Sequence, residues 1–343
     1  MNRFAPFALA GALLSGLFAM TAQAQEQVLN LYSSRHYQSD EALYANFTKA
    51  TGIRVNRIDG KEDELIQRIR REGAASPADV FLTVDAANLQ AADDAGLFAP
   101  VRSKVLDARI PDQYHGENEH WFGYSYRARV IVYNKDKLRP EDVDTYQDLA
   151  SPRLKGKLCV RSGGHVYNRT LMAAMIYNNG DENALDWARG VVANLARPPK
   201  GGDTDQIRAV AAGECDVAIS NHYYFARIMA SSKPEDQEVV KKVGLIFPDQ
   251  KGKGTHVNIS GAGMLKYAPN KAAAVKFLEY LATDEAQAYF ANGNNEWPVV
   301  ESVKLGNKQL DAMGKFKVDR LSAGVLAQYT PKAQRFIDRA GWK

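Results

Sequence analysis

The sequence predicts an α/β protein of two lobes with a ligand-binding cleft between them, and three observations support this. Short apolar runs alternate with amphipathic stretches of helical period, which is the pattern of α/β folds. The extended segment 122–134 is longer than an ordinary strand, so we expect it to cross from one lobe to the other. Residues 255–260 have a similar character and predict the return crossing. Two lobes joined in this way leave a cleft, the usual place for a ligand.

The first lobe is predicted to begin with three strands, each followed by a helix. In the first helix Leu43 and Phe47 share the inward face, and Ser39 or Asp40 is the expected N-cap. The strands are expected at 28–33, 53–58 and 78–82, and the helices at 40–50, at 62–72 and from Asp85 to a stop at Gly96.

The second lobe is predicted to repeat the alternation between the two crossings. Its strands are expected at 157–161, 215–220 and 243–247, and its helices at 170–178, 182–195 and 204–213. A helix at 270–282, capped by Asn270, then rejoins the first lobe, and a last helix is expected near 332–340. These elements place residues 25–126 and 257–298 in an N-terminal lobe, and residues 127–256 and 299–343 in a C-terminal lobe.

Residues 1–24 have the pattern of a cleavable signal peptide. Arg3 supplies the positive charge, an apolar run follows at 7–20, and Ala22-Gln23-Ala24 is a small-residue cleavage site. The apolar run is too short for a membrane-spanning helix. No cysteine lies at the cleavage point, which favours a free exported protein over a lipid-anchored one. We therefore predict that the mature chain is exported to the periplasm.

Charge and motif content exclude several classes of function. Loss of the leader removes one basic residue of 44, which leaves 43 basic against 40 acidic residues with the two signs interspersed. This is not the charge pattern of a nucleic-acid or membrane-surface protein. The chain has no G-x-S-x-G, H-E-x-x-H or P-loop motif, and Gly163-Gly164 is too weak a signal for a phosphate-binding loop. We therefore expect a binding protein, not an enzyme.

The only two cysteines, Cys159 and Cys215, each lie eight residues before a tyrosine, Tyr167 and Tyr223. If their strands are neighbours in a parallel sheet, the two sulfur atoms lie at similar height and could form a disulfide, which an oxidising compartment permits. Chain entropy would make such a bond worth about 4 kcal/mol. The alternative is a pair of buried thiols.

Tyrosines and histidines gather just after three of the predicted strands. The stretches are Ser34-Arg35-His36-Tyr37, Ser162-Gly163-Gly164-His165-Val166-Tyr167 and Asn221-His222-Tyr223-Tyr224. Open α/β sheets present their ligand-binding groups at the carboxyl ends of the strands. The sequence therefore predicts one site for a hard cation, built from oxygen and nitrogen ligands.

Several of these segments resemble the periplasmic ferric-iron-binding proteins, the substrate-binding subunits of iron(III) ABC importers, which have the type II periplasmic-binding-protein fold. The resemblance covers essentially the whole mature chain. It rests on residues 33–37, Ser76-Pro77-Ala78-Asp79-Val80, the crossing segment 126–134, Gly213-Glu214, residues 221–224 and the carboxyl end, Arg339-Ala340-Gly341-Trp342-Lys343.

The resemblance implies that Fe³⁺ lies in the interlobe cleft, held by His36 and Tyr37 of the first lobe and by Tyr167, Tyr223 and Tyr224 of the second. It also implies a monomer that delivers iron to an ABC-transporter permease in the inner membrane. The transferrin-like branch of the family uses a glutamate after the third strand, where this chain has about Val84. The chain is thus similar to the tyrosine-rich branch, and carbonate or another synergistic anion is an additional candidate ligand.

The ligand types suit this ion. Fe³⁺ is a hard acid that prefers anionic oxygen, and a phenol of ordinary pKa about 10 loses its proton when it binds such a cation. Each phenol recruited releases a proton, so affinity falls in acid. Four phenolates, a neutral imidazole and Fe³⁺ would together carry one net negative charge. Arg127 on the crossing segment and Arg227, three residues beyond Tyr224, are expected to balance it.

Two alternatives have the same fold. His165 and His222, which we expect to be exposed loop residues, keep a Zn²⁺ or Mn²⁺ site open because imidazole suits those ions. The other is a binding protein for a small organic ligand, such as a polyamine or a phosphonate, which would call for carboxylates or a serine-rich anion site at the strand ends.

Overall fold

The computed structural model describes residues 27–35 and 37–343. The predicted signal peptide and His36 lie outside the described residues. Within the described part of the chain, no helix combines the length and apolar character that a membrane crossing requires.

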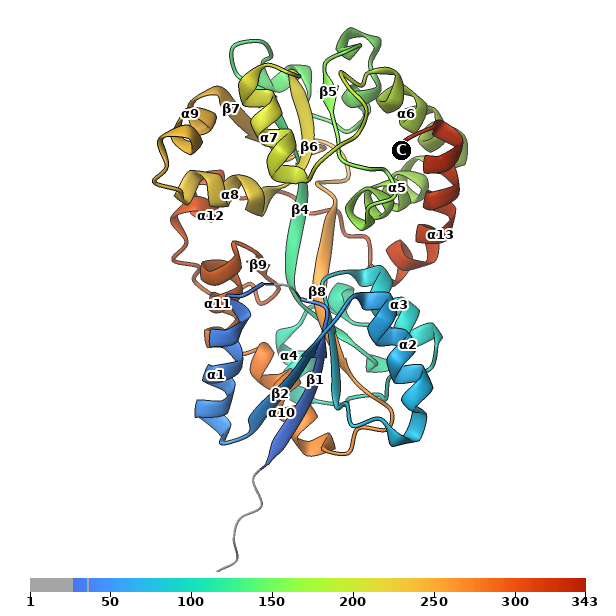
Figure 1. Ribbon diagram of the computed structural model, residues 1–343, viewed down its shortest axis with the longest axis vertical. Coiled ribbons are helices and arrows are strands. Elements are labelled where there is room, and N and C mark those ends of the chain that lie inside the picture. Colours follow the sequence, from blue (N-terminus) through green and yellow to red (C-terminus); the bar gives the residue numbers. More distant parts are fainter. Residues whose placement is uncertain (1–26, 36) are drawn as a thin grey trace, which may run out of the picture.

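In the part of the chain that the structure describes, a mixed sheet of nine strands runs through both lobes (Figure 1). The strand order is β2-β1-β3-β8-β4-β6-β5, and β7 and β9 also pair with β4. The strands are β1 (Val28–Ser33), β2 (Arg54–Asp59), β3 (Val80–Thr83), β4 (Phe122–Asn134), β5 (Leu158–Cys159), β6 (Val217–Asn221), β7 (Val243–Ile246), β8 (Val257–Met264) and β9 (Trp297–Pro298).

Strands β4 and β8 connect the lobes, as the sequence predicted. The first half of β4 pairs antiparallel with β8, and its second half pairs antiparallel with β6 and β7. Figure 1 shows both strands passing from the lower lobe, which holds β1 and β2, to the upper lobe, which holds β5 and β6. Every residue of β4 except Tyr126 is buried, because sheet neighbours and helices cover it along its length.

Helices cover the sheet in both lobes. They are α1 (Asp40–Thr51), α2 (Glu62–Glu72), α3 (Ala86–Asp94), α4 (Lys104–Arg109), α5 (Val166–Asn179), α6 (Asp181–Ala193), α7 (Asp203–Ala212), α8 (His222–Ala230), α9 (Pro234–Lys242), α10 (Lys271–Leu281), α11 (Asp284–Asn294), α12 (Lys308–Met313) and α13 (Ala323–Ala340). Asp85, where the sequence predicted the start of α3, is the N-cap of that helix, and its carboxylate accepts a hydrogen bond from the backbone N–H of Ala87. Asn270 is the N-cap residue of α10 but its side chain makes no capping bond, because it donates to Asp79 instead.

Each lobe has its own apolar core. One core gathers residues of β1, β3, α1, α2, α3 and α10, including Phe47, Phe81 and Phe277. Two further clusters lie in the other lobe, one around Leu171 and Trp187 and one around the buried cysteines. Helix α13 contacts α5 and α6 in the upper lobe and α3 in the lower lobe, so the carboxyl-terminal segment also joins the two.

The sequence did not predict helices α4, α8, α9, α11 and α12, and two of the predicted helices begin earlier than expected. Helix α5 begins at Val166 rather than near residue 170, and α13 begins at Ala323 rather than near 332. Pro331 lies inside α13, although proline lacks an N–H and clashes with the preceding turn. The buried face of α13 continues past it from Leu326 to Ala333, so packing against both lobes outweighs the local cost.

Candidate metal centre

The four predicted tyrosines come from three segments that meet between the lobes. Tyr223 and Tyr224 lie in the first turn of α8, directly after β6, and Tyr37 lies between β1 and α1. Tyr167 lies in the first turn of α5 and not directly after a strand, which corrects the sequence prediction. The imidazole of His165 caps this helix by accepting a hydrogen bond of 3.3 Å from the backbone N–H of Tyr167.

The four rings are close together and largely buried. The hydroxyls of Tyr167 and Tyr223 are hydrogen-bonded at 3.0 Å. Tyr37 meets Tyr223 edge to face with ring centroids 6.4 Å apart, and the rings of Tyr223 and Tyr224 are 4.2 Å apart. Tyr37, Tyr167 and Tyr223 are 7%, 5% and 0% exposed, so the lobes are closed over these phenols.

Burial keeps these phenols protonated in the absence of a cation. Desolvation raises the pKa of Tyr37 to about 12, with a further contribution from the Glu296 carboxylate. Desolvation also raises the pKa values of Tyr167 and Tyr223, and the neighbouring phenols add to both shifts. A cation bound among them would reverse this, because it would be the largest local charge.

Arg127 is buried beside the tyrosines. Its guanidinium donates to the hydroxyl of Ser260 at 2.6 Å and to the backbone carbonyls of Ile259 and Val84. Although desolvation opposes its charge, Glu296 and the phenols of the site raise its pKa, so the guanidinium stays charged. Its Nε has no hydrogen-bond partner among the described residues, which leaves a donor available inside the site.

Sequence reasoning missed Glu296, a fully buried carboxylate beneath this site. Glu296 pairs with Arg35 at 3.2 Å and with Arg127 at 3.7 Å, and it accepts a hydrogen bond from Ser125. Desolvation alone would raise its pKa, but the two guanidinium groups outweigh this and lower it. Arg35 is itself paired with Asp40 at 2.7 Å. No local pattern marks Glu296, because its partner Arg35 is 261 residues away.

Arg227 lies at the solvent side of the phenols. Its Cζ atom is 5.6, 5.0 and 5.8 Å from the ring centroids of Tyr37, Tyr223 and Tyr224. The residue is exposed, in contrast to Arg127. Its position one turn along α8 therefore places a second cation over rings from both lobes.

A further arginine fixes the segments that carry the C-lobe tyrosines. Arg129 of β4 donates to Asn168 at 2.8 Å, to Asn221 at 3.1 Å and to Asp203. Asn168 adjoins Tyr167, and Asn221 ends the strand before Tyr223. One buried guanidinium thus holds α5, α7 and β6 together next to the phenols.

The histidines near the site are already engaged, contrary to our expectation of exposed loop residues. His222 is fully buried. Its Nδ1 accepts a hydrogen bond of 3.1 Å from the backbone N–H of Ala128, and its Nε2 donates one of 2.7 Å to the backbone carbonyl of Asn295. Burial lowers the pKa values of His222 and His165 to about 3. Across the described residues, no three His, Cys, Asp or Glu side chains are grouped so that they could hold a metal ion. The phenol oxygens are the distinctive ligands here.

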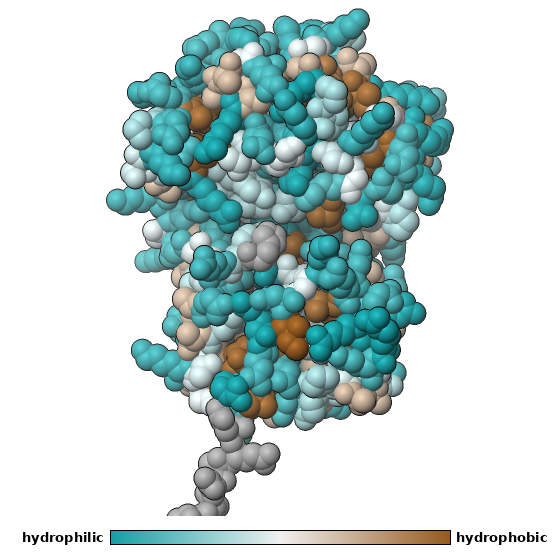
Figure 2. All heavy atoms as spheres, viewed as in Figure 1, coloured by the Kyte–Doolittle hydropathy of each residue, from teal (hydrophilic) through white to brown (hydrophobic). Residues whose placement is uncertain are grey.

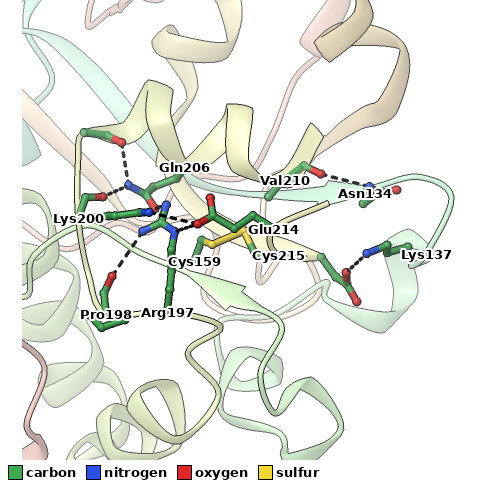
Figure 3. Close-up of a disulfide and its surroundings, with 12 residues drawn as sticks. Asn134, Lys137, Cys159, Arg197, Pro198, Lys200, Gln206, Val210, Glu214 and Cys215 are labelled. Atoms are coloured by element: carbon green, nitrogen blue, oxygen red, sulfur yellow. Dashed lines mark hydrogen bonds and ion pairs between the residues drawn. A yellow bond between two sulfur atoms is a disulfide. The ribbon is translucent and has the colours of Figure 1, made fainter. Parts of the chain in front are cut away.

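Cys159 and Cys215 are joined in a disulfide, with their Cα atoms 5.9 Å apart (Figure 3). Strands β5 and β6 are parallel neighbours, with Cys159 opposite Ala218. Figure 3 shows the bond beside an ion pair of Arg197 with Glu214, whose Nε and Oε1 atoms are 2.9 Å apart. The bond ties together the two segments that lead to Tyr167 and Tyr223.

A cavity of about 690 Å³ lies next to the site in the N-terminal lobe. Its lining includes Ser34, Arg35, Tyr37, Arg57 and Lys61 from the ends of β1 and β2 and the start of α2. Tyr37 therefore lines this cavity and also meets Tyr223 of the other lobe.

Comparison with known proteins gives consistent matches over nearly the whole chain. Residues 42–317 match the model of a family described as bacterial extracellular solute-binding protein. Iron uptake proteins A1 and A2 of Synechocystis sp. are 47% and 48% identical to the chain, over 93% and 97% of its length and 88% and 95% of theirs. The major ferric iron-binding protein of Neisseria meningitidis is 27% identical over 97% of this chain and 98% of that one.

Solved structures share the fold. A Trichodesmium protein (IdiA, FutA), solved in complex with iron and citrate, superposes with a TM-score of 0.88 at 52% identity, over 92% of this chain and 100% of that one. The ferric binding protein of Campylobacter jejuni superposes with a TM-score of 0.86 at 40% identity, over 92% and 100%. The chain therefore has the type II periplasmic-binding fold that we expected, with two α/β lobes joined by crossing strands.

Proposed function

Because the chain belongs to the family of bacterial extracellular solute-binding proteins, we propose that it captures ferric iron between its lobes and delivers it to the permease of an ABC transporter for iron uptake. The observation that carries this proposal is the meeting of four phenols from both lobes in one buried space. The iron uptake proteins and ferric-binding structures among its relatives support the same cargo.

The proposed ligands are the phenolate oxygens of Tyr37, Tyr167, Tyr223 and Tyr224, together with the imidazole of His36. Fe³⁺ prefers anionic oxygen ligands, and the hydroxyl oxygens of Tyr167 and Tyr223 are already 3.0 Å apart. Carbonate or another small anion is a further candidate ligand, and the unpartnered Nε of Arg127 is a donor that would suit one.

Arg127 and Arg227 are proposed to balance the charge of the loaded site. Phenolates around a trivalent ion leave net negative charge in a buried place, which is costly unless it is paired. Arg127 supplies a buried cation from the crossing strand, and Arg227 supplies an exposed one over three of the rings.

Ligands from both lobes make iron a cross-link that favours the closed form, by no more than its differential affinity for that form. We take the lobes to be residues 25–126 with 257–298 and residues 127–256 with 299–343, as the sequence predicted. The permease would recognise the closed protein, and reopening would release the iron. We propose a periplasmic monomer, since the face shown in Figure 2 is mostly hydrophilic and its hydrophobic residues are scattered.

The other candidates have less support. A Zn²⁺ or Mn²⁺ site would draw on imidazoles, but both ring nitrogens of His222 are already bonded to backbone groups. An organic cation would need carboxylates facing the phenols, and the one beneath them, Glu296, is neutralised by Arg35 and Arg127.

The test is iron binding by the purified, iron-free protein. Addition of Fe³⁺ as citrate should give a red to orange colour from phenolate-to-iron charge transfer, and Zn²⁺ or Mn²⁺ should neither produce it nor prevent it at equal concentration. The Tyr223→Phe/Tyr224→Phe variant should lose the colour and the binding. Tyr177→Phe is the matched control, because that ring is 52% exposed and lies outside the site. Undiminished binding in the double variant would reject the assignment.

A further inference from the structure

A second, smaller cavity lies in the C-terminal lobe where the return strand begins. Its volume is about 140 Å³, and none of the four site tyrosines lines it. The lining comes from the segment before β8, from the carboxyl-terminal half of α5 and from the segment that leads to α13. It includes Tyr146, Met175, Asn178, Asp249, His256 and Asp319.

Two carboxylates of this cavity form no ion pair among the described residues, although Lys253 also lines the cavity and its charge partly offsets the rise in the pKa of Asp319. Among the described residues, neither Asp249 nor Asp319 has a cationic group within 4.0 Å, although their neighbours Asp144 and Asp148 pair with Lys251 and Arg153. Asn178 donates a hydrogen bond of 2.8 Å to Asp319. Desolvation raises the pKa of Asp249 to about 6, and the carboxylates of Asp148, Asp319 and Asp144 add to the shift. Desolvation also raises the pKa of Asp319.

A buried imidazole in the same lining lacks a partner. His256 is only 3% exposed, and its Nε2 has no hydrogen-bond partner among the described residues. Burial and the nearby Arg129 lower its pKa to about 3, so the ring is neutral and can accept a hydrogen bond. A buried polar atom without a partner is costly, and a ligand that supplies donors would remove that cost.

We propose that this cavity binds a small organic ammonium ion, held by the carboxylates of Asp249 and Asp319 and by the imidazole of His256. Ammonium groups carry several donors and a positive charge, which is what two unpaired carboxylates and a free acceptor require. A metal ion fits less well, because no three metal-binding side chains of the described chain are suitably grouped. The cavity has the volume of about five water molecules, each of which takes up ~30 Å³ in the liquid. This size limits the ligand to a few non-hydrogen atoms.

The cavity lies against the start of the crossing strand β8, the segment that leads to α13, and helix α5. His256 directly precedes β8, and the backbone N–H of Asp319 donates to the carbonyl of Thr255 at 2.9 Å. Met175 and Asn178 belong to α5, the helix that carries Tyr167 at its start. A bound ammonium ion would add contacts among these three segments and stabilise the folded protein in proportion to its occupancy.

Isothermal titration and thermal unfolding of the whole mature protein, with and without iron, test the proposal. The probes are ethanolamine and 1,4-diaminobutane, with 1,4-butanediol as the uncharged comparison and Mg²⁺ as the metal comparison. We expect the two amines to bind and to raise Tm, and the diol and Mg²⁺ to do neither. Asp249→Asn and Asp319→Asn should each weaken amine binding at least about tenfold, the effect of losing one charge-assisted hydrogen bond.

The control variant is Asp338→Asn, an exposed carboxylate of α13, which should bind the amines as the parent protein does. Absence of amine binding at millimolar concentration, equal binding of the diol, or unchanged affinity in both cavity variants would overturn the proposal. The Tyr223→Phe/Tyr224→Phe variant should retain amine binding, so failure here and failure of the iron assignment remain distinguishable.

Discussion

The two halves of the tyrosine site are built differently. The C-terminal half contributes Tyr167, Tyr223 and Tyr224 from two helix starts, which Arg129 and the disulfide hold in fixed relation. The N-terminal half contributes Tyr37 among the described residues, and beneath it Arg35 and Glu296 form a buried charge network with Arg127 of the crossing strand.

This difference suggests a division of roles. The C-terminal half is a preorganised set of phenols that would bind iron first. The N-terminal half adds a phenol and compensating charge, so it would close over an ion that is already held. If the division is correct, substitutions in the two halves should differ in kind as well as in size.

The largest expected effect is on iron binding by the C-terminal half. Tyr223→Phe/Tyr224→Phe should lower iron affinity by more than the ~10–100-fold that loss of an outer-shell partner costs, because two anionic ligands are removed. Tyr37→Phe should retain coloured binding but lose iron-dependent closure, which small-angle scattering would detect as the absence of compaction. Equal losses of affinity in both variants would contradict the division of roles.

The second-largest expected effect is on the stability of the folded protein, through the charge network beneath Tyr37. Glu296→Gln removes the anion that Arg35 and Arg127 share, and breaking such a buried pair typically costs about 3–5 kcal/mol. The free energy of unfolding in urea should fall accordingly. The control is Glu301→Gln, which changes an exposed carboxylate nearby in sequence and should leave the free energy of unfolding nearly unchanged. Matching curves for the two variants would show that the network does not stabilise the fold.

A smaller stability effect is expected in the C-terminal half. Replacing both cysteines, Cys159→Ser with Cys215→Ser, should lower the free energy of unfolding by about 2–4 kcal/mol, the usual range for a native disulfide. Iron affinity should fall as well if the bond helps to position Tyr167 and Tyr223. Urea unfolding and iron titration of the same samples separate the two consequences, and unchanged iron affinity would assign the bond to stability alone.

The smallest expected effect is on the pH dependence of stability, through the carboxylate of Asp249. Asp249 forms no ion pair among the described residues, whereas Glu296 is paired with two arginines. Its pKa is raised to about 6 in the folded protein, so the folded state binds the proton more tightly than the unfolded chain and stability falls as pH rises from about 4 to 6. Asp249→Asn should therefore raise Tm at pH 7.5 and change it little at pH 4, with a gain of up to ~1 kcal/mol after allowance for solvent screening. Asparagine also tolerates the positive φ of 61° at this position. Equal Tm differences at both pH values would show that the charge is not responsible.

The sequence alone determined most of the strands and many of the helices, but it gave no indication of α4, α8, α9, α11 or α12. The bounds of the crossing strand β4 agree with the predicted 122–134, and α2 with the predicted 62–72, because apolar periodicity and extended residue preference are local properties of the chain. The four tyrosines were marked by their place after predicted apolar runs and by the resemblance to ferric-iron-binding proteins, although Tyr167 lies in α5, eight residues beyond the last residue of β5.

Only the tertiary structure decided which distant groups meet. Gly163, read from sequence as a weak phosphate-loop signal, allows the chain end to pack closely, since a Cβ there would lie 2.5 Å from the carbonyl oxygen of Trp342. Glu296 reaches Arg35 across most of the chain, and His222 is engaged by backbone groups of two other segments. Such contacts depend on how the lobes close over each other, and buried charges and polar groups take whichever partners that closure supplies.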